Sequence, residues 1–135
     1  MNDAKSSGSA RMYKIRLELA RSPGAPQGSP GDGYEFYAPL DDARHIDLDG
    51  WKEHKALCFV HRLEDNVTVE RGILAHRPGG TGGATWAFDY DYTADGDEEP
   101  GFRFDTHAFQ VGQYVSIRDH DGELQTYRVA NVTHA

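Results

Sequence analysis

The sequence has little cysteine, no long apolar run and a shortage of basic residues, and each of these excludes a class of protein. Cys58 is the single cysteine in 135 residues, so no internal disulfide can form, and the lone thiol fits a reducing cytoplasm. The longest unbroken apolar run is Ala56–Val60, whereas a membrane-spanning helix needs about 20 residues. Lys and Arg number 14 against 22 Asp and Glu, and the resulting net charge of −8 opposes binding to phosphate backbones. We therefore expect a cytoplasmic protein with no membrane and no nucleic-acid partner.

Motifs typical of catalytic and cofactor sites are missing as well. The chain has no Gly-x-Ser-x-Gly turn, no His-Glu-x-x-His pair, no Cys-x-x-Cys pair and no phosphate loop ending in Gly-Lys-Ser or Gly-Lys-Thr. The glycine cluster Gly79–Gly83 precedes a predicted strand rather than a helix, so it indicates a strand connection and not a phosphate site. We predict no cofactor, and an enzymatic function is the less favoured alternative.

The length of the chain is typical of one domain. Residues 1–11 contain few apolar side chains, and we expect a flexible tail there because little burial would repay the entropy lost on ordering them. Residues 12–135 are expected to form a single β-rich domain. The stretch Ser22–Gly33 holds three prolines and four glycines and predicts an irregular loop within this domain.

Alternation of apolar and polar residues predicts strands through most of the domain. Tyr13–Leu19 and Trp86–Tyr92 both repeat with a period of two. Gln113–Arg118 and Glu123–Val132 flank Asp121-Gly122, a dipeptide typical of tight hairpins. Six to eight short strands predict a mainly β fold, either a small barrel or a strongly coiled antiparallel sheet, because closure hides strand edges.

One short α-helix is predicted at Leu48–Leu57, with Asp47 or Asp49 as its N-cap. The next strand, Leu57–Leu63, is apolar on both faces over most of its length, which is typical of a strand covered on both sides. Cys58 lies in this run and is expected to be a core residue rather than a nucleophile. The other side chains that we expect in the core are Ile15, Leu17, Leu19, Phe36, Trp51, Leu57, Phe59, Trp86, Phe88, Val115, Ile117 and Val129.

Five stretches of the chain carry a resemblance to a known group of proteins. They are Tyr13–Arg21, Tyr34–Asp41, His76–Gly80, Trp86–Asp91 and Tyr114–Asp119. In these stretches the chain resembles a family of small uncharacterised proteobacterial proteins. The resemblance implies a bacterial source, and because that family has no known activity it implies no catalytic residue. The segment Val111–Ile117 and the hairpin after it are loosely similar to the strands of SH3-like barrels.

Aromatic and acidic side chains gather near the end of the predicted strand Trp86–Tyr92. Residues 89–99 contain six acidic side chains and no Lys or Arg. Tyrosine rings can hold a cation against their faces while carboxylates attract it, so we expect a cationic ligand here: a basic peptide, a basic protein patch or a divalent ion. The candidate ligand- or partner-binding residues are Tyr90, Tyr92, Asp89, Asp91, Arg103 and His76.

The same acidic segment partly matches a calcium-binding loop. The candidate metal ligands are Asp91, Asp95, Asp97 and Glu99. Phe102 stands where the clamping glutamate of such a loop is required, so any calcium binding is expected to be weak. A solvated acidic connection between strands explains the same residues.

Two functions stay open at this point. The first is a small, monomeric, non-enzymatic binding or interaction module that uses its acidic, aromatic-rimmed surface. The alternative is a small hydrolytic enzyme that uses His and Asp residues as acid and base, for which His76, His107 and one aspartate would have to converge in a cavity.

Overall fold

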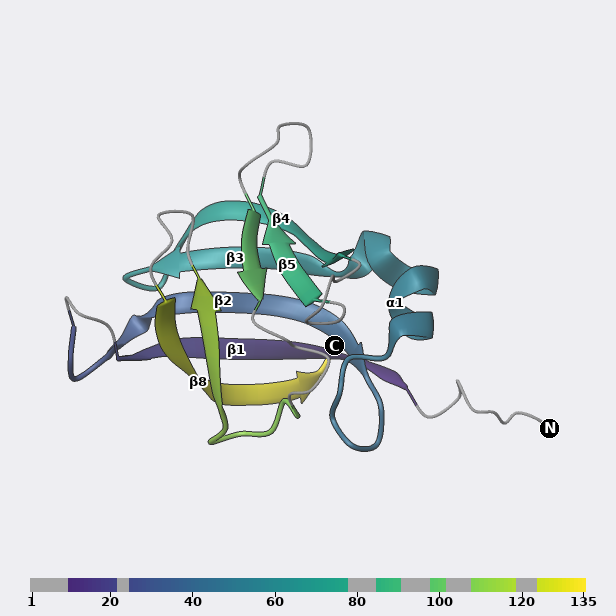
Figure 1. Ribbon diagram of the computed structural model, residues 1–135, viewed down its shortest axis with the longest axis horizontal. Coiled ribbons are helices and arrows are strands. Elements are labelled where there is room, and N and C mark those ends of the chain that lie inside the picture. Colours follow the sequence, from purple (N-terminus) through teal and green to yellow (C-terminus); the bar gives the residue numbers. More distant parts are fainter. Residues whose placement is uncertain (1–9, 22–24, 78–84, 91–97, 102–107, 119–123) are drawn as a thin grey trace.

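The computed structural model describes residues 10–21, 25–77, 85–90, 98–101, 108–118 and 124–135 (Figure 1). Within these residues the chain forms eight strands, one α-helix and one short 3-10 helix. In chain order they are β1 (Arg11–Arg21), β2 (Ser29–Leu40), α1 (Leu48–His54), η2 (Lys55–Leu57), β3 (Phe59–Glu64), β4 (Val67–Arg77), β5 (Thr85–Asp89), β6 (Glu98–Gly101), β7 (Tyr114–Arg118) and β8 (Leu124–His134).

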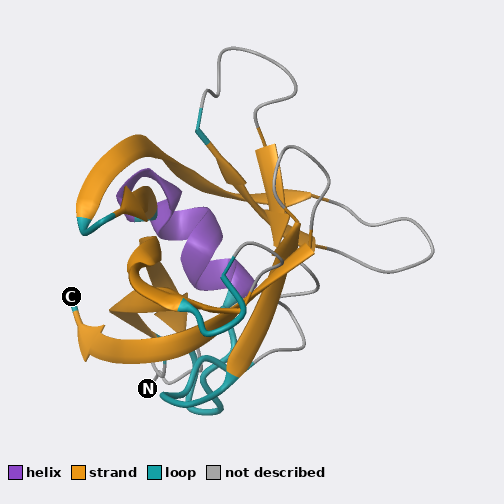
Figure 2. Cartoon of the chain, turned by 90° about the vertical axis from the view of Figure 1, so that its left-hand side faces the viewer, coloured by secondary structure: helices purple, strands orange, loops and turns teal. Residues whose placement is uncertain are grey.

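The strands form one curled antiparallel sheet. Each strand pairs with the next along the chain, and β1 also pairs with β8, which closes the sheet into a barrel. Among the described residues, the seam between β6 and β7 is the shortest, with one register pair, Gly101 and Ile117. Figure 2 shows the strongly curved strands, and Figure 1 shows α1 at one end of the barrel. The predicted mainly β fold with one short helix is confirmed.

The helix begins where the sequence predicts it. Of the two aspartates that could cap it, Asp47 does so: its carboxylate accepts a hydrogen bond from the backbone N–H of Gly50 at 2.8 Å. The backbone N–H of Asp47 also donates to the carbonyl oxygen of Pro39 in β2, at 2.9 Å. Trp51 ties the helix to β4, because its indole N–H donates to the carbonyl oxygen of Leu74 at 3.0 Å. The helix is therefore held to the barrel at both its start and its apolar face.

The core fills the inside of the barrel with inward-facing side chains of alternate strand positions. Phe36 lies near its centre, with ring centroids 5.2 Å from Phe88 and 5.6 Å from Phe109. The expected core residues that are fully buried are Ile15, Leu17, Phe36, Trp86, Phe88, Val115, Ile117 and Val129. Leu19 and Trp51 are partly buried and pack against this cluster.

The prediction of the core was wrong at two residues, Leu57 and Phe59. Leu57 is 55% exposed and Phe59 is 47% exposed. Cys58 and Val60 are the fully buried residues of this stretch, and since successive side chains of a strand point to opposite faces, Phe59 must face outward. The strand is apolar on both faces, as the sequence indicates, but only one of those faces is covered.

Strand boundaries account for the remaining differences in the fold. The predicted loop Ser22–Gly33 is shorter than expected, because β2 already begins at Ser29. The turn at Asp121-Gly122 lies outside the described residues, but the strands that flank it, β7 and β8, pair antiparallel as predicted. The predicted tail also lies outside the described residues as far as residue 9, and β1 begins at Arg11.

Neither helical segment of the described chain has the length and apolar character needed to span a bilayer.

Candidate functional site

An open groove of about 670 Å³ lies on the outer face of strands β1 to β4, next to η2. We call it the Phe59 groove. Its lining residues are Met12 from β1, Tyr37 from β2, Leu57 from η2, Phe59 and His61 from β3, Arg71 from β4, and Ala135. Most of these side chains are apolar, and two large ones, Leu57 and Phe59, are about half exposed.

Strand alternation places the aromatic rings in the groove. Phe59 faces outward because its neighbours Cys58 and Val60 face the core. Tyr37 follows the same rule between two buried residues of β2. The rings of Tyr37 and Phe59 meet edge to face with centroids 6.4 Å apart, so the floor of the groove is a preformed aromatic pair.

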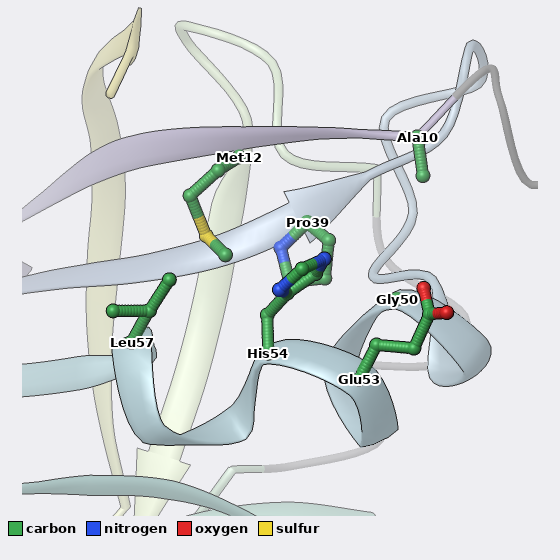
Figure 3. A pocket seen from close by; sticks show the side chains of 7 residues that line it. All are labelled: Ala10, Met12, Pro39, Gly50, Glu53, His54 and Leu57. Atoms are coloured by element: carbon green, nitrogen blue, oxygen red, sulfur yellow. The ribbon is translucent and has the colours of Figure 1, made fainter.

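A second, smaller pocket of about 210 Å³ continues the groove toward the helix. The two share Met12 and Leu57, whose side chains reach toward one another from β1 and η2 (Figure 3). Pro39 lies between β1 and the helix in this view. Gly50 allows the close packing there, because a Cβ on it would lie 3.0 Å from Cβ of Pro39. The complete lining is Ala10, Met12, Pro39, Gly50, Glu53, His54 and Leu57.

The wall of the Phe59 groove farthest from the helix is basic. Arg71 and His61 face each other across the register of β3 and β4. No carboxylate of the described chain lies within ion-pair distance of Arg71. Two other arginines of the same sheet are each paired with two carboxylates: Arg16 with Glu18 and Glu35, and Arg62 with Glu64 and Glu70. Arg71 therefore presents an uncompensated positive charge to the groove, although the chain as a whole is acidic.

His76, which the sequence singles out, lies elsewhere. Its ring centroid is 4.7 Å from that of Trp86 and 5.9 Å from that of Trp51. These rings pack where α1 meets β4 and β5, and Lys55 lies over the Trp51 ring at 5.4 Å. The contacts of His76 are thus those of an aromatic cluster at the end of the barrel.

The acidic, aromatic-rimmed surface is described only in part. Tyr90 is partly buried and packs against the core, and Asp89 is buried, with 8% of its surface exposed. Asp89 therefore does not form an open rim. Tyr92, Asp91, Arg103, Asp95, Asp97 and His107 lie outside the described residues, as does the side chain of Glu99, whose backbone pairs with Phe88. The assignment of these residues to a ligand or calcium site stays a prediction.

The histidines and acids of the described chain do not form a metal cluster. Among these residues, no three His, Cys, Asp or Glu side chains lie together as a metal site requires. In the described strand register, His61 is opposite Arg71 of β4 and Glu35 of β2. Of the residues named for the hydrolytic alternative, His107 lies outside the described residues, so that alternative stays a prediction.

Cys58 has the properties of a core residue, as predicted. It is fully buried, and burial raises the pKa of its thiol to about 12. Its Sγ donates a weak hydrogen bond to the carbonyl oxygen of His54 at 3.5 Å. A thiol with so high a pKa stays protonated at neutral pH and is a poor nucleophile.

Because the Cys58 thiol is buried, we expect the fold to lose stability as the pH rises above about 9. The unfolded thiol ionises near its ordinary pKa of 9.0, whereas the folded thiol has its pKa raised to about 12. The contribution is therefore fully present below about pH 9 and is lost as the pH rises toward 12. We expect the stability difference between Cys58→Ala and the unsubstituted protein to change across this window and to be constant below it, as measured by urea unfolding at several pH values. A difference that is flat over the whole range would contradict the burial of Cys58.

The groove residues Tyr37, Leu57 and Phe59 were not among the candidates that the sequence supplied. A signal for Leu57 and Phe59 exists, because the stretch Leu57–Leu63 is apolar on both faces. Such a pattern indicates that both faces are covered, either by the protein itself or by something that binds to it. Within the described chain Phe59 is 47% exposed, so its face of the strand is only partly covered.

Comparison of the chain with protein-family models, with curated proteins and with solved structures gave no match. The resemblance to a family of small proteobacterial proteins therefore stays a prediction. The geometry of the site is what bears on function.

Proposed function

We propose that this protein is a small, non-enzymatic binding module and that the Phe59 groove is its binding site. The observation that carries the proposal is the exposure of Phe59 and Leu57, 47% and 55%, beside the preformed ring pair of Tyr37 and Phe59. Large apolar side chains in one open groove are typical of surfaces that bind a partner.

The driving force for binding is burial of this apolar area. Covering the exposed half of Phe59 and of Leu57 is worth on the order of 1 kcal/mol each, at about 25 cal/mol per Å². Aromatic residues at the centre of a contact often contribute more than their area indicates, because water is excluded around them. The groove suits a weak, reversible contact of modest area.

The test uses an uncharged probe that carries two apolar side chains, the peptide Gln-Ser-Leu-Ser-Phe-Ser-Gln with blocked ends. We expect it to shift the amide resonances of Tyr37, Phe59 and His61 in a titration. Phe59→Ser should weaken this binding about tenfold, because it removes the central apolar contact.

Val67→Ser is the matched control. Val67 is also a strand residue with an exposed apolar side chain, 61% exposed, but it does not line the groove. Its substitution should leave the affinity unchanged. Binding that Phe59→Ser and Val67→Ser weaken equally, or shifts that map to another part of the barrel, would overturn the proposal.

A second candidate site is the acidic segment, for which a basic peptide or protein is the proposed partner. Its support is the partly buried ring of Tyr90 together with the six acidic residues that the sequence has at positions 89–99. Calcium and a Lys-rich peptide are the probes, and shifts of Tyr90 that occur without shifts of Phe59 would favour this site over the groove.

We further propose that the module is a monomeric bacterial protein of the cytoplasm that binds no nucleic acid. The supports are the single, buried thiol and the net charge of −8. Sedimentation at two protein concentrations tests the monomer. A salt-dependent gel shift with duplex or single-stranded nucleic acid would overturn the last part.

A further inference from the structure

We propose that the occupant of the Phe59 groove is an extended, acidic segment of another protein, with two apolar side chains followed by a carboxylate. This rests on the proposed function and adds to it the chemistry of the partner. Three features support this proposal. Arg71 has no ion pair among the described residues, and Glu35 is already paired with basic side chains. The third feature is the order of apolar and basic residues across the strands.

The charge of the groove selects for an acidic partner. Arg71 and His61 form its basic wall, and Arg71 has no ion pair within the described chain. Among the described residues, the carboxylate nearest to this wall in the strand register is Glu35, which is opposite His61. Glu35 is already neutralised, because Arg16 lies 3.0 Å and Lys14 3.7 Å from its oxygens. Within the part of the chain that the structure describes, an incoming carboxylate therefore meets positive charge without a competing negative one.

The order of residues across the sheet sets the spacing in the partner. Met12 and Leu57 lie at one end of the groove, the ring pair of Tyr37 and Phe59 follows, and Arg71 lies at the other end. From β1 to β4 there are three inter-strand steps of about 4.8 Å each, about 14 Å in total. An extended chain covers that distance in about four residues, with alternate side chains on one face. This places two apolar side chains two positions apart and the carboxylate two positions beyond them.

The geometry favours a chain segment over a small molecule. The groove is open and crosses the outer faces of several strands, whereas sites for small ligands enclose most of the ligand surface. A second copy of this chain is the main competing occupant, because it would present the same apolar residues.

The experiment compares three peptides that differ only in their end charges: Glu-Ser-Leu-Ser-Phe-Ser-Glu, the same peptide with Gln in place of Glu, and the same with Lys. Charge at both ends makes the result independent of the direction of binding. Amide shifts of Phe59 and His61 report the affinity. We expect the Glu peptide to bind about three-fold more tightly than the Gln peptide at low salt, and the Lys peptide to bind more weakly. Added salt should reduce the difference.

Charge reversal at the groove wall sharpens the test. Arg71→Glu should invert the order of the three peptides, so that the Lys peptide binds best. Arg21→Glu is the matched control, because Arg21 is an exposed residue at the far end of β1 that does not line the groove. Arg21→Glu should leave the order of the three peptide affinities unchanged. Because it changes the net charge by the same amount as Arg71→Glu, it controls for the general effect of net charge.

The outcomes separate this inference from the proposed function. Equal affinity of the three peptides would overturn the acidic partner while leaving an apolar binding groove in place. Absence of binding by all three would overturn both. Shifts of Phe59 that grow with protein concentration without peptide, together with a dimer in sedimentation, would identify the occupant as a second copy and overturn the inference.

Discussion

Phe36→Ala should lower the free energy of unfolding by about 3–5 kcal/mol, the range for removing a fully buried aromatic ring. Phe36 is fully buried, and its ring packs against those of Phe88 and Phe109, which are distant from it in the sequence. The substitution removes the transfer free energy of the ring and leaves a cavity between strands that the closed barrel cannot collapse easily. Urea unfolding of the two proteins measures the loss.

The matched control for Phe36→Ala is the same substitution at Phe59. This residue is about half exposed, so Phe59→Ala should cost less than about 1 kcal/mol. Because both substitutions are Phe to Ala, the difference between the two losses tests whether Phe36 is in the core and Phe59 is in an open groove. Equal losses at the two positions would mean that Phe59 is covered and that the groove is closed in solution.

Gly72→Ala should destabilise the fold by about 3 kcal/mol, at the upper end of the cost of overpacking. A Cβ at this position would collide with backbone atoms of β5 and the residue after it, namely the carbonyl oxygen of Asp89 and Cα of Tyr90. Backbone atoms of a paired strand cannot move aside as a flexible side chain can, so β4 and β5 would have to separate. Circular dichroism with heat or urea measures the loss.

Gly112→Ala separates this steric cost from the conformational cost of losing glycine. A Cβ on Gly112 meets no atom within 4 Å, but its φ is +95°, a region that L-residues rarely adopt. We expect a loss of about 1–2 kcal/mol there. If Gly72→Ala costs no more than about 0.5 kcal/mol, β4 and β5 do not approach as closely as the structure has them.

The outline of the fold was predictable from local patterns. Period-two alternation in Tyr13–Leu19 identifies a strand with one face buried, and Ile15 and Leu17 are fully buried. The helix and its cap were also predictable, since aspartate before an apolar helical repeat is an N-cap signal. The sequence could not predict that Asp47 rather than Asp49 is the cap. That choice depends on the hydrogen bond from the backbone of Asp47 to Pro39, which belongs to a separate strand.

The Phe59 groove was less accessible to sequence reasoning. Leu57–Leu63 is apolar on both faces, and such a strand is typical of the interior of a protein. Which face is covered depends on what the rest of the chain places against it, and the sequence of the strand carries no information on that. The acidic segment, in contrast, is conspicuous in the sequence, but most of its residues lie outside the described part of the chain.

The sequence by itself determined the class of the fold, the position of the helix and most of the buried residues, because period-two alternation and capping are local properties of the chain. Only the tertiary structure decided which face of β3 is buried and brought Met12, Tyr37, Phe59 and Arg71 together from four strands. The reason is physical. Closing the barrel turns one face of every strand toward a single shared interior, so an apolar side chain on the other face stays in water unless a partner covers it.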